Sequence, residues 1–221
     1  MTNDPAPHTT SPIKAALFDF GGVILSSPFD AFAEYEARKG LPERFIRTLN
    51  ATNPDTNAWA LFERNEVDFD TFCDLFEAEA IKAGHPIEAR EVMPLLRGEL
   101  RPTMVEAVRR CSERLKTACL TNNVVGFNDF PQRATAPGRE AVLAMFDAII
   151  ESSKVGVRKP DPKFYEIACE TLEIEPSEAV FLDDLGVNLK PARAMGMTTI
   201  KVGDPAVAIA ELAAVVGFPL A

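Results

Sequence analysis

Polar residues that can carry chemistry stand where three short apolar runs of the chain end. They are Asp19, Thr121, Asn122, Asp183 and Asp184. In an open α/β sheet, ligands bind outside the carboxyl ends of the strands. If the three runs are strands of one sheet, these residues converge on one crevice although they lie far apart in the sequence.

The chemistry of these side chains fits together. Asp19, Asp183 and Asp184 would bring three carboxylates close, and like charges repel unless a cation joins them. A small set of oxygen ligands suits Mg²⁺, which keeps waters and a substrate phosphate oxygen. Thr121 offers a hydroxyl, and the amides after it can donate to an anion. Lys159, just before a predicted helix start, can balance phosphate charge. This set supplies the positioning and charge neutralisation that phosphoryl transfer requires.

Five apolar runs predict buried strands, because each run is continuous and does not alternate with polar residues. The runs are Ile13–Phe20, Thr117–Thr121, Ala148–Ser152, Ala179–Asp183 and Thr198–Val202. Helix-period patterns lie between or after them, at Met104–Leu115, Pro162–Leu172, Leu189–Met195 and Pro205–Val216. Strands that alternate with helices predict an α/β fold, a doubly wound parallel sheet with helices on both faces.

The stretch from residue 27 to residue 102 breaks this alternation. It has no good candidate for a buried strand, and its aromatic and aliphatic residues recur mostly every three or four positions. We therefore expect residues 27–102 to form an inserted α-helical cap with an aromatic core. Residues 13–26 and 103–221 would form the α/β core domain. Residues 1–12 are polar and rich in Pro and Thr, so we expect a flexible tail and no secretory signal.

Four short motifs stand in the order typical of the haloacid dehalogenase-like (HAD) hydrolase superfamily, and the chain resembles that family over about residues 13–204. The motif residues are Asp19, Thr121, Lys159 and the pair Asp183-Asp184. The insertion lies where one class of the superfamily carries a helical cap. Glu151–Pro162 and Phe181–Arg193 are similar to a narrower group. It includes the amino-terminal phosphatase domain of soluble epoxide hydrolase and the corresponding domain fused to some acyl-CoA dehydrogenases.

The resemblance implies a Rossmann-like HAD core and a role for each motif residue. Asp19 would be the nucleophile, forming an aspartyl-phosphate that water then hydrolyses. Thr121, the Asn122 amide and Gly22 would hold the phosphate. Lys159 would balance the charge in the site.

The resemblance also implies Mg²⁺ as the cofactor. Asp19 and Asp183 would bind the ion directly, and Asp184 would bind it directly or through water. The backbone carbonyl of Gly21 would be a further ligand. Two residues near the start of the following predicted helix are expected beside these ligands, Asn188 and Lys190.

One position departs from the phosphatases of this family, which usually carry a second aspartate two residues after the nucleophile as general acid and base. Gly21 stands there. A positioned acid or base contributes about 10²–10⁴-fold in rate. Three interpretations of Gly21 are open. The substrate can have a good leaving group, as acyl and anomeric sugar phosphates do, or another acid can take the place of the missing aspartate. In the third, the protein has lost phosphatase activity and has kept phosphate binding. The candidate substitutes are Asp30, Glu34 and Glu36.

Our leading prediction is a Mg²⁺-dependent phosphohydrolase that acts on a small phosphorylated metabolite. One alternative is a haloacid dehalogenase-type hydrolase, in which Asp19 attacks a carbon that carries a halogen and no metal is needed. The pair Asp183-Asp184 argues against it, because a metal-free site gains little from two repelling carboxylates. The other alternative is a non-catalytic phosphate-binding or regulatory module, and Gly21 is its sole support.

Composition narrows the class of partner. Of the 221 residues, 47% are hydrophobic and 25% are charged, as in ordinary globular proteins. The net charge of −10 argues against a nucleic-acid or membrane partner, and no apolar run is long enough to span a bilayer. The four cysteines lack metal-binding spacing, so we expect buried free thiols and a cytoplasmic protein. We expect a monomer or a weak homodimer.

Overall fold

A five-stranded parallel sheet forms the centre of the molecule in the computed structural model, which describes residues 12–124 and 138–220. The strand order is β3-β2-β1-β4-β5. The strands are β1 (Ala15–Phe18), β2 (Lys116–Thr121), β3 (Ala148–Glu151), β4 (Ala179–Asp183) and β5 (Thr198–Lys201). Each strand lies within one predicted run or extends it by one residue. The predicted doubly wound α/β fold is confirmed.

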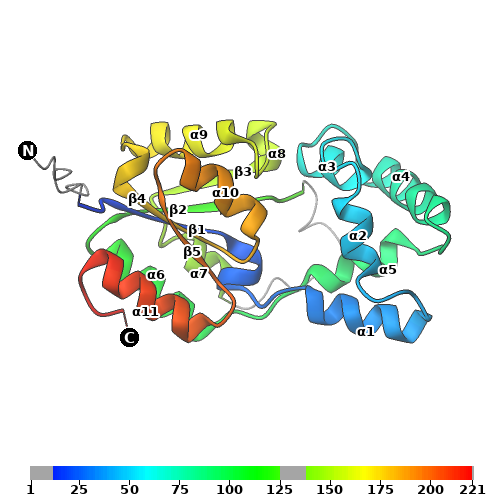
Figure 1. The fold of residues 1–221 in the computed structure, drawn as a ribbon, viewed down its shortest axis with the longest axis horizontal. Helices are drawn as coiled ribbons and strands as arrows, with labels where there is room; N and C mark the ends of the chain where they lie inside the picture. Colours follow the sequence, from blue (N-terminus) through cyan, green and yellow to red (C-terminus); the bar gives the residue numbers. More distant parts are fainter. Residues whose placement is uncertain (1–11, 125–137, 221) are drawn as a thin grey trace, which may run out of the picture.

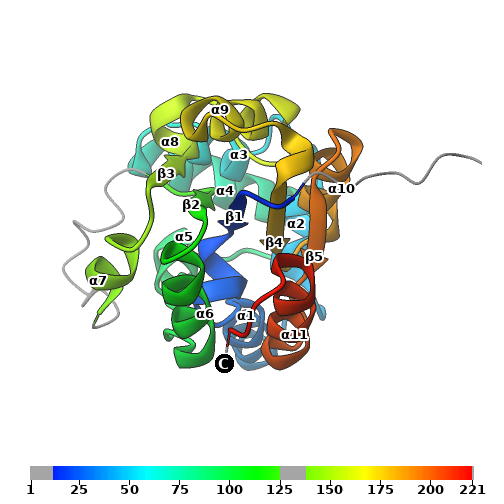
Figure 2. The same cartoon turned by 90° about the vertical axis from the view of Figure 1, so that its left-hand side faces the viewer.

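Helices cover both faces of the sheet (Figures 1 and 2). They are α6 (Pro102–Ser112) and α11 (Pro205–Val216) on one face, and α9 (Pro162–Leu172) and α10 (Gly186–Ala194) on the other. In β1, Ala16 and Phe18 pack towards α6 and α11, whereas Ala15 and Leu17 pack towards α9 and α10. All four residues are fully buried. A central strand with no exposed face explains why its sequence is continuously apolar.

The edge strands correct the expectation that all five runs are buried. Ile149 of β3 is 39% exposed, and Ile200 is the only buried residue of β5. The first run also ends as a strand earlier than predicted, at Phe18, because the chain turns into the π-helical turn η1 (Phe20–Ile24). Likewise Ser152, predicted as strand, begins the short helix α8 (Ser152–Val155).

A separate group of helices lies beyond the carboxyl ends of the strands, on the right in Figure 1. Its elements are α1 (Phe29–Lys39), α2 (Phe45–Ala51), α3 (Ala58–Glu63), α4 (Phe69–Lys82), α5 (Ala89–Val92) and η2 (Met93–Leu96). We call this group the helical unit. It has its own apolar core, in which Phe62, Phe72 and Phe76 are buried and Trp59 packs against them.

Two linkers, which lie side by side although they are far apart in the sequence, join the helical unit to the sheet domain. Leu25 and Leu100 form an antiparallel bridge. The Ser26 amide donates to the Glu99 carbonyl at 2.8 Å, and the Glu99 amide donates to Ser26 Oγ at 3.0 Å. A Cβ on Gly98 would lie 2.7 Å from Leu25 Cβ and 2.8 Å from the Ser26 carbonyl oxygen. Gly98 therefore allows the two linkers to approach this closely.

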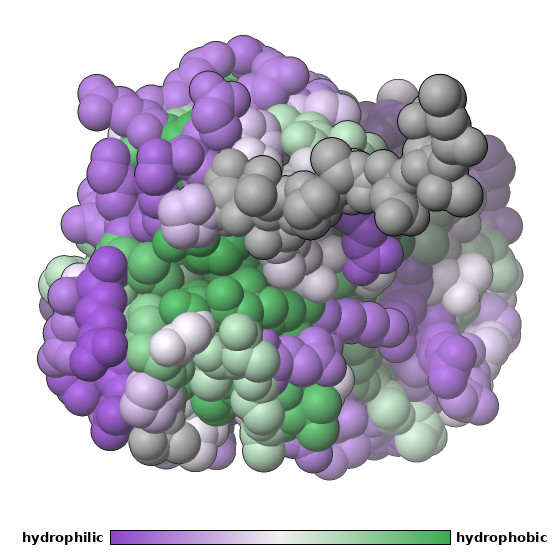
Figure 3. All heavy atoms as spheres, turned by 60° about the vertical axis from the view of Figure 1, so that its left-hand side comes forward, coloured by the Kyte–Doolittle hydropathy of each residue, from purple (hydrophilic) through white to green (hydrophobic). Residues whose placement is uncertain are grey.

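The remaining described elements are short, α7 (Arg139–Leu143) and η3 (Pro176–Glu178). Within the described ranges, none of the helices combines the length and the apolar character that crossing a membrane requires. All four cysteines are buried free thiols, as predicted. Figure 3 faces the end of the molecule remote from the helical unit and shows apolar side chains gathered there. This surface lies away from the carboxyl ends of the strands.

Candidate active site

Three acidic side chains meet at the carboxyl edge of the sheet, where β1 and β4 end side by side. Asp19 follows β1, Asp183 ends β4, and Asp184 follows it. Each residue offers a carboxylate oxygen, and these oxygens lie within 4.8 Å of one another. The parallel pairing of Phe18 with Leu182 brings the two strand ends level, so residues distant in sequence converge as predicted.

Asp19 is fixed by the turn that it begins. Its Oδ1 accepts the Phe20 amide at 2.6 Å and lies 2.9 Å from Lys159 Nζ. The backbone amide of Asp19 donates to the Leu182 carbonyl at 2.9 Å, which continues the sheet pairing by one residue. Both contacts are made to Oδ1, and no residue in the described ranges donates a hydrogen bond to Oδ2. One oxygen thus orients the carboxylate, and the other is available for chemistry.

Lys159 bridges the two strand ends from below the surface. Its Nζ lies 2.9 Å from Asp19 Oδ1 and 2.8 Å from Asp183 Oδ2, and the residue is 1% exposed. Burial disfavours the charge of this ammonium, but Asp183 and Asp19 outweigh that effect and raise the pKa of Lys159 above its usual range. Lys159 therefore stays charged and holds the two carboxylates together.

The Asp183 carboxylate is fully engaged. Besides Lys159, it accepts Asn188 Nδ2 at 3.0 and 3.1 Å and the Leu185 amide at 2.8 Å. Asp184 is less buried, and its carboxylate accepts no hydrogen bond from another described residue. Asp184 thus keeps more of its oxygen lone pairs available than Asp183 does.

The electrostatics of the cluster fit a divalent cation. Burial, chiefly, and then the negative charge of Asp183 raise the pKa of Asp184 to about 6, although Lys159 and Arg101 oppose this rise. Burial also raises the pKa of Asp19 well above its usual range, with Lys159 opposing and Asp183 adding to the shift. When ionised, the three carboxylates carry one more charge than the Lys159 ammonium and the nearby Arg101 guanidinium together, so negative charge remains in excess. A hard cation with oxygen ligands, such as Mg²⁺, would neutralise it.

The two glycines after Asp19 have different surroundings. Gly22 has a φ of +77°, and a Cβ there would lie 2.3 Å from Asp184 Oδ2. Only glycine lets this backbone approach the Asp184 carboxylate so closely. Gly21 has φ −72° and ψ 132°, which any residue adopts, and a Cβ there would meet no described atom within 4 Å. The backbone therefore has room for a side chain where the usual acid is missing.

The Asn122 side chain forms two hydrogen bonds with the Lys159 backbone, which its position in the sequence does not predict. Its side-chain Nδ2 donates to the Lys159 carbonyl at 3.0 Å, and its Oδ1 accepts the Lys159 amide at 2.9 Å. The side chain thus clamps the Lys159 backbone, and its own backbone amide is left as the group that can face a phosphate. Thr121 ends β2 beside Asn122 and is half-buried. No sequence pattern signals this clamp, because it joins a strand end to a loop far along the chain.

Other sequence candidates lie in distinct places. Asn188 contacts Asp183 as described above, whereas Lys190 is exposed and, within the described ranges, forms no hydrogen bond or ion pair with the three carboxylates. Of the possible substitute acids, Glu36 is buried and accepts the Arg44 and Ile46 amides, so its carboxylate has a structural role. Asp30 and Glu34 are exposed on α1.

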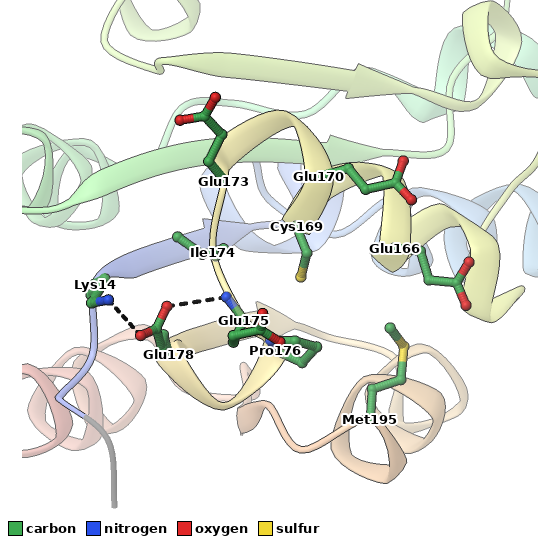
Figure 4. Close-up of a pocket in the computed structure, with 10 residues that line it drawn as sticks. All are labelled: Lys14, Glu166, Cys169, Glu170, Glu173, Ile174, Glu175, Pro176, Glu178 and Met195. Carbon is green, nitrogen blue, oxygen red and sulfur yellow. Dashed lines mark hydrogen bonds and ion pairs between the residues drawn. The ribbon is translucent and has the colours of Figure 1, made fainter.

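A cavity of about 610 Å³ lies at the opposite end of the sheet (Figure 4). Lys14, which precedes β1, and Glu178, which precedes β4, form an ion pair at its rim. Since Asp19 and Asp183 lie at the carboxyl ends of these two strands, this cavity is separate from the acidic cluster.

Fold and site together define a hydrolase class, and comparison with known families agrees. The family model of haloacid dehalogenase-like hydrolases matches residues 13–196, and the chain belongs to this family. It is 34% identical over 215 residues to acyl-CoA dehydrogenase family member 10 of Mus musculus, covering 94% of this chain and 19% of that protein. It is 31% identical to bifunctional epoxide hydrolase 2 of Sus scrofa, covering 94% of this chain and 40% of that protein. The chain thus spans less than half the length of both relatives.

A third relative matches along nearly its whole length. It is the sesquiterpene phosphatase astK of Aspergillus oryzae, 27% identical over 208 residues, with 92% of this chain and 97% of that protein covered. Among solved structures, an HAD family enzyme of Bacteroides thetaiotaomicron in complex with magnesium has a TM-score of 0.59 and 18% identity. The match covers 88% of this chain and 96% of that chain. This likeness supports the fold.

Proposed function

We propose that this hydrolase is a Mg²⁺-dependent phosphatase of a small phosphorylated metabolite. The observation that carries the proposal is the Lys159 ammonium between Asp19 and Asp183, with the Asp184 carboxylate in the same cluster. This arrangement supplies a buried nucleophile, a fixed positive charge and a cation site within one crevice. Phosphatase-named relatives and a magnesium-bound structural neighbour support the same proposal.

In the proposed reaction, the free Oδ2 of Asp19 attacks phosphorus, and the bond from phosphorus to the leaving oxygen breaks. The resulting aspartyl-phosphate is then attacked at phosphorus by water, which releases inorganic phosphate and restores the carboxylate. Thr121, the Asn122 amide and Gly22 hold the phosphoryl oxygens. Lys159 balances the charge that develops on them.

Asp19, Asp183 and Asp184 with the Gly21 carbonyl would hold the Mg²⁺ ion. When bound, the ion would neutralise phosphate charge and orient the substrate for in-line attack. Because Asp183 already accepts four hydrogen bonds, we propose that Asp184 supplies the more accessible carboxylate oxygen.

Gly21 bears on the choice of substrate. With no carboxyl group at this position, the leaving oxygen receives its proton from water or departs as an anion. Both routes favour good leaving groups such as acyl phosphates and anomeric sugar phosphates. The exposed positions of Asp30 and Glu34 and the engaged carboxylate of Glu36 give little support for a substitute acid.

We propose that residues 27–102 act as a cap over the site, on a core of residues 13–26 and 103–221. The tail predicted at residues 1–12 lies outside the described residues, apart from Pro12. The position of the helical unit beyond the strand ends supports this division (Figure 1). A cap there would exclude water and select the leaving group. We further propose a cytoplasmic monomer or weak homodimer without nucleic-acid or membrane partners.

The test is phosphate release from a broad panel of small phosphate esters, with and without Mg²⁺, beside the Asp19→Asn variant. The panel includes acyl phosphates, sugar 1-phosphates and alkyl phosphates. We expect metal-dependent release that the variant lacks. Full activity in chelator, or release by the variant, contradicts the proposal, and haloacid turnover without metal would favour the dehalogenase alternative.

A further inference from the structure

A buried ion pair joins the helical unit to the loop that carries Lys159. Glu63 ends α3, and Arg158 directly precedes Lys159; Arg158 Nε lies 3.0 Å from Glu63 Oε2. The Glu63 side chain is only 11% exposed, and the Arg158 side chain is 19% exposed. Helices α3 and α8 lie against each other at this place (Figure 1). The pair therefore spans the contact between the helical unit and the sheet domain.

The Glu63 end of the pair is held by two further contacts. Trp59 Nε1 donates to Glu63 Oε1 at 2.9 Å, so the indole fixes the carboxylate from the same helix. Ser152 Oγ, at the start of α8, donates to the Glu63 carbonyl at 2.7 Å. Glu63 is thus anchored to the helical unit through its side chain and to the sheet domain through its backbone.

The Arg158 end acts on the Lys159 backbone. Arg158 Nε also lies 3.3 Å from the Lys159 carbonyl, the same oxygen that Asn122 Nδ2 contacts at 3.0 Å. Lys159 is therefore held on its backbone by two neighbours and on its ammonium by Asp19 and Asp183. A continuous chain of contacts runs from Trp59 through Glu63 and Arg158 to the nucleophile.

The incomplete hydrogen bonding of this pair indicates that it positions Lys159 more than it stabilises the fold. Glu63 Oε2 and Arg158 Nη1 are buried and have no hydrogen bond in the described part of the chain. Burial raises the pKa of Glu63, and the nearby charge of Arg158 opposes the rise. Desolvating an incompletely hydrogen-bonded ion pair costs about as much as its attraction returns, so such a pair adds little net stability. The main effect of the pair is therefore on the position of the Lys159 backbone.

We infer that Glu63 and Arg158 are positioning residues, which together set the Lys159 backbone so that its ammonium lies between Asp19 and Asp183. The expected effect on kinetics rests on the proposed phosphatase function. The expected effect on the Lys159 backbone rests only on the contacts described above. It also gives the helical unit a direct part in ordering the catalytic groups.

The structural part is tested by amide NMR of the full chain. Trp59 is the only tryptophan, so its indole N–H gives one signal, to be read beside the Asn122 side-chain amide and the Lys159 backbone amide. We expect Glu63→Gln and Arg158→Gln each to shift all three signals. Glu66→Gln, which breaks the nearby pair of Arg64 with the exposed Glu66, is the matched control and should shift none. Unmoved Lys159 and Asn122 signals in both variants overturn the inference, whatever the activity.

The kinetic part uses the best ester of the panel. Misplacing a catalytic group by about 1 Å can cost about 10²-fold in rate. We expect Glu63→Gln and Arg158→Gln to lower kcat by about 10- to 100-fold with a smaller change in KM, and the swap Glu63→Arg/Arg158→Glu to restore part of the loss. Unchanged kcat in folded single variants overturns the inference. A wild-type chain that releases no phosphate contradicts the proposed function instead, and the NMR result then decides the inference alone.

Discussion

At the scale of single residues, the neighbours of the Asp19 carboxylate determine what the site can do. Oδ1 is held by Phe20 and Lys159, so the free oxygen is presented in one orientation. The ammonium of Lys159 lies between two carboxylates that would otherwise repel each other. The residue two positions after Asp19 offers no further functional group, since Gly21 has no side chain.

Gly21→Asp should restore the missing acid. The backbone angles suit any residue, and the space beside Gly21 is open, so the new carboxyl group should be accommodated without strain. We expect alkyl phosphate hydrolysis to rise by about 10²-fold or more, and acyl phosphate hydrolysis to change little. The measurement is kcat/KM on both substrate types. Asparagine has nearly the same size as aspartate but no acidic group. An equal gain in Gly21→Asn would therefore show that proton transfer does not cause the higher rate.

Gly22→Ala should damage the proposed cation site. Its Cβ would meet the Asp184 carboxylate at 2.3 Å, and the positive φ adds backbone strain. We expect Mg²⁺ affinity to fall by about 10- to 100-fold, as when groups that orient metal ligands are removed. Gly21→Ala is the control, because its Cβ meets no described atom within 4 Å. Titration of activity with Mg²⁺ makes the comparison, and equal affinities in the two variants would refute the predicted clash.

The residues at strand ends could be predicted from the sequence, and the contacts between them could not. Asp19 and Asp183 stand out because each ends an apolar run, and parallel strands share one carboxyl edge. The Asn122 clamp on Lys159 and the pair of Glu63 with Arg158 join segments far apart in the chain. No local periodicity or spacing encodes such contacts.

At the scale of elements, the linkers between the helical unit and the sheet domain matter most. The Leu25–Leu100 bridge and the hydrogen bonds of Ser26 with Glu99 hold two linkers together. A tight crossing of this kind fixes where the helical unit sits relative to the strand ends. Gly98 is the position that permits it.

Gly98→Ala should therefore lower stability. The new Cβ would press on the Ser26 carbonyl at 2.8 Å, and backbone atoms cannot move aside as a flexible side chain can. Overpacking of this kind costs about 1–3 kcal/mol, so we expect a lower Tm in thermal unfolding. Gly203→Ala is the control, since a Cβ there meets no described atom within 4 Å. A Tm equal to that of the control would mean that the linkers yield without cost.

Prediction of elements succeeded where the pattern was long and regular. The observed α9 and α11 have the predicted bounds, because Pro162 and Pro205 mark their first turns. The edge strands β3 and β5 were expected to be buried because their runs are apolar. The run alone does not tell a central strand from an edge strand, since that depends on the order of strands in the sheet.

At the scale of the whole molecule, the acidic cluster joins β1, β4 and the turns after them, so a cation that binds there should stabilise the fold. A ligand that binds only the native state adds about 2.7 kcal/mol at a concentration one hundred times its Kd. We expect Mg²⁺ to raise the Tm of the metal-free chain, and Asp184→Asn to lose most of that increase. A Tm of the wild-type chain that Mg²⁺ does not move would contradict a native cation site.

The central claim is that Asp19 becomes phosphorylated during turnover. The most direct test is a single turnover with radiolabelled acetyl phosphate and Mg²⁺, stopped with acid, followed by measurement of label on the protein. We predict protein-bound label that hydroxylamine removes, as expected of an acyl phosphate, that maps to Asp19, and that is absent from Asp19→Asn. Phosphate release without any protein-bound label, or label that persists in the variant, would contradict the mechanism.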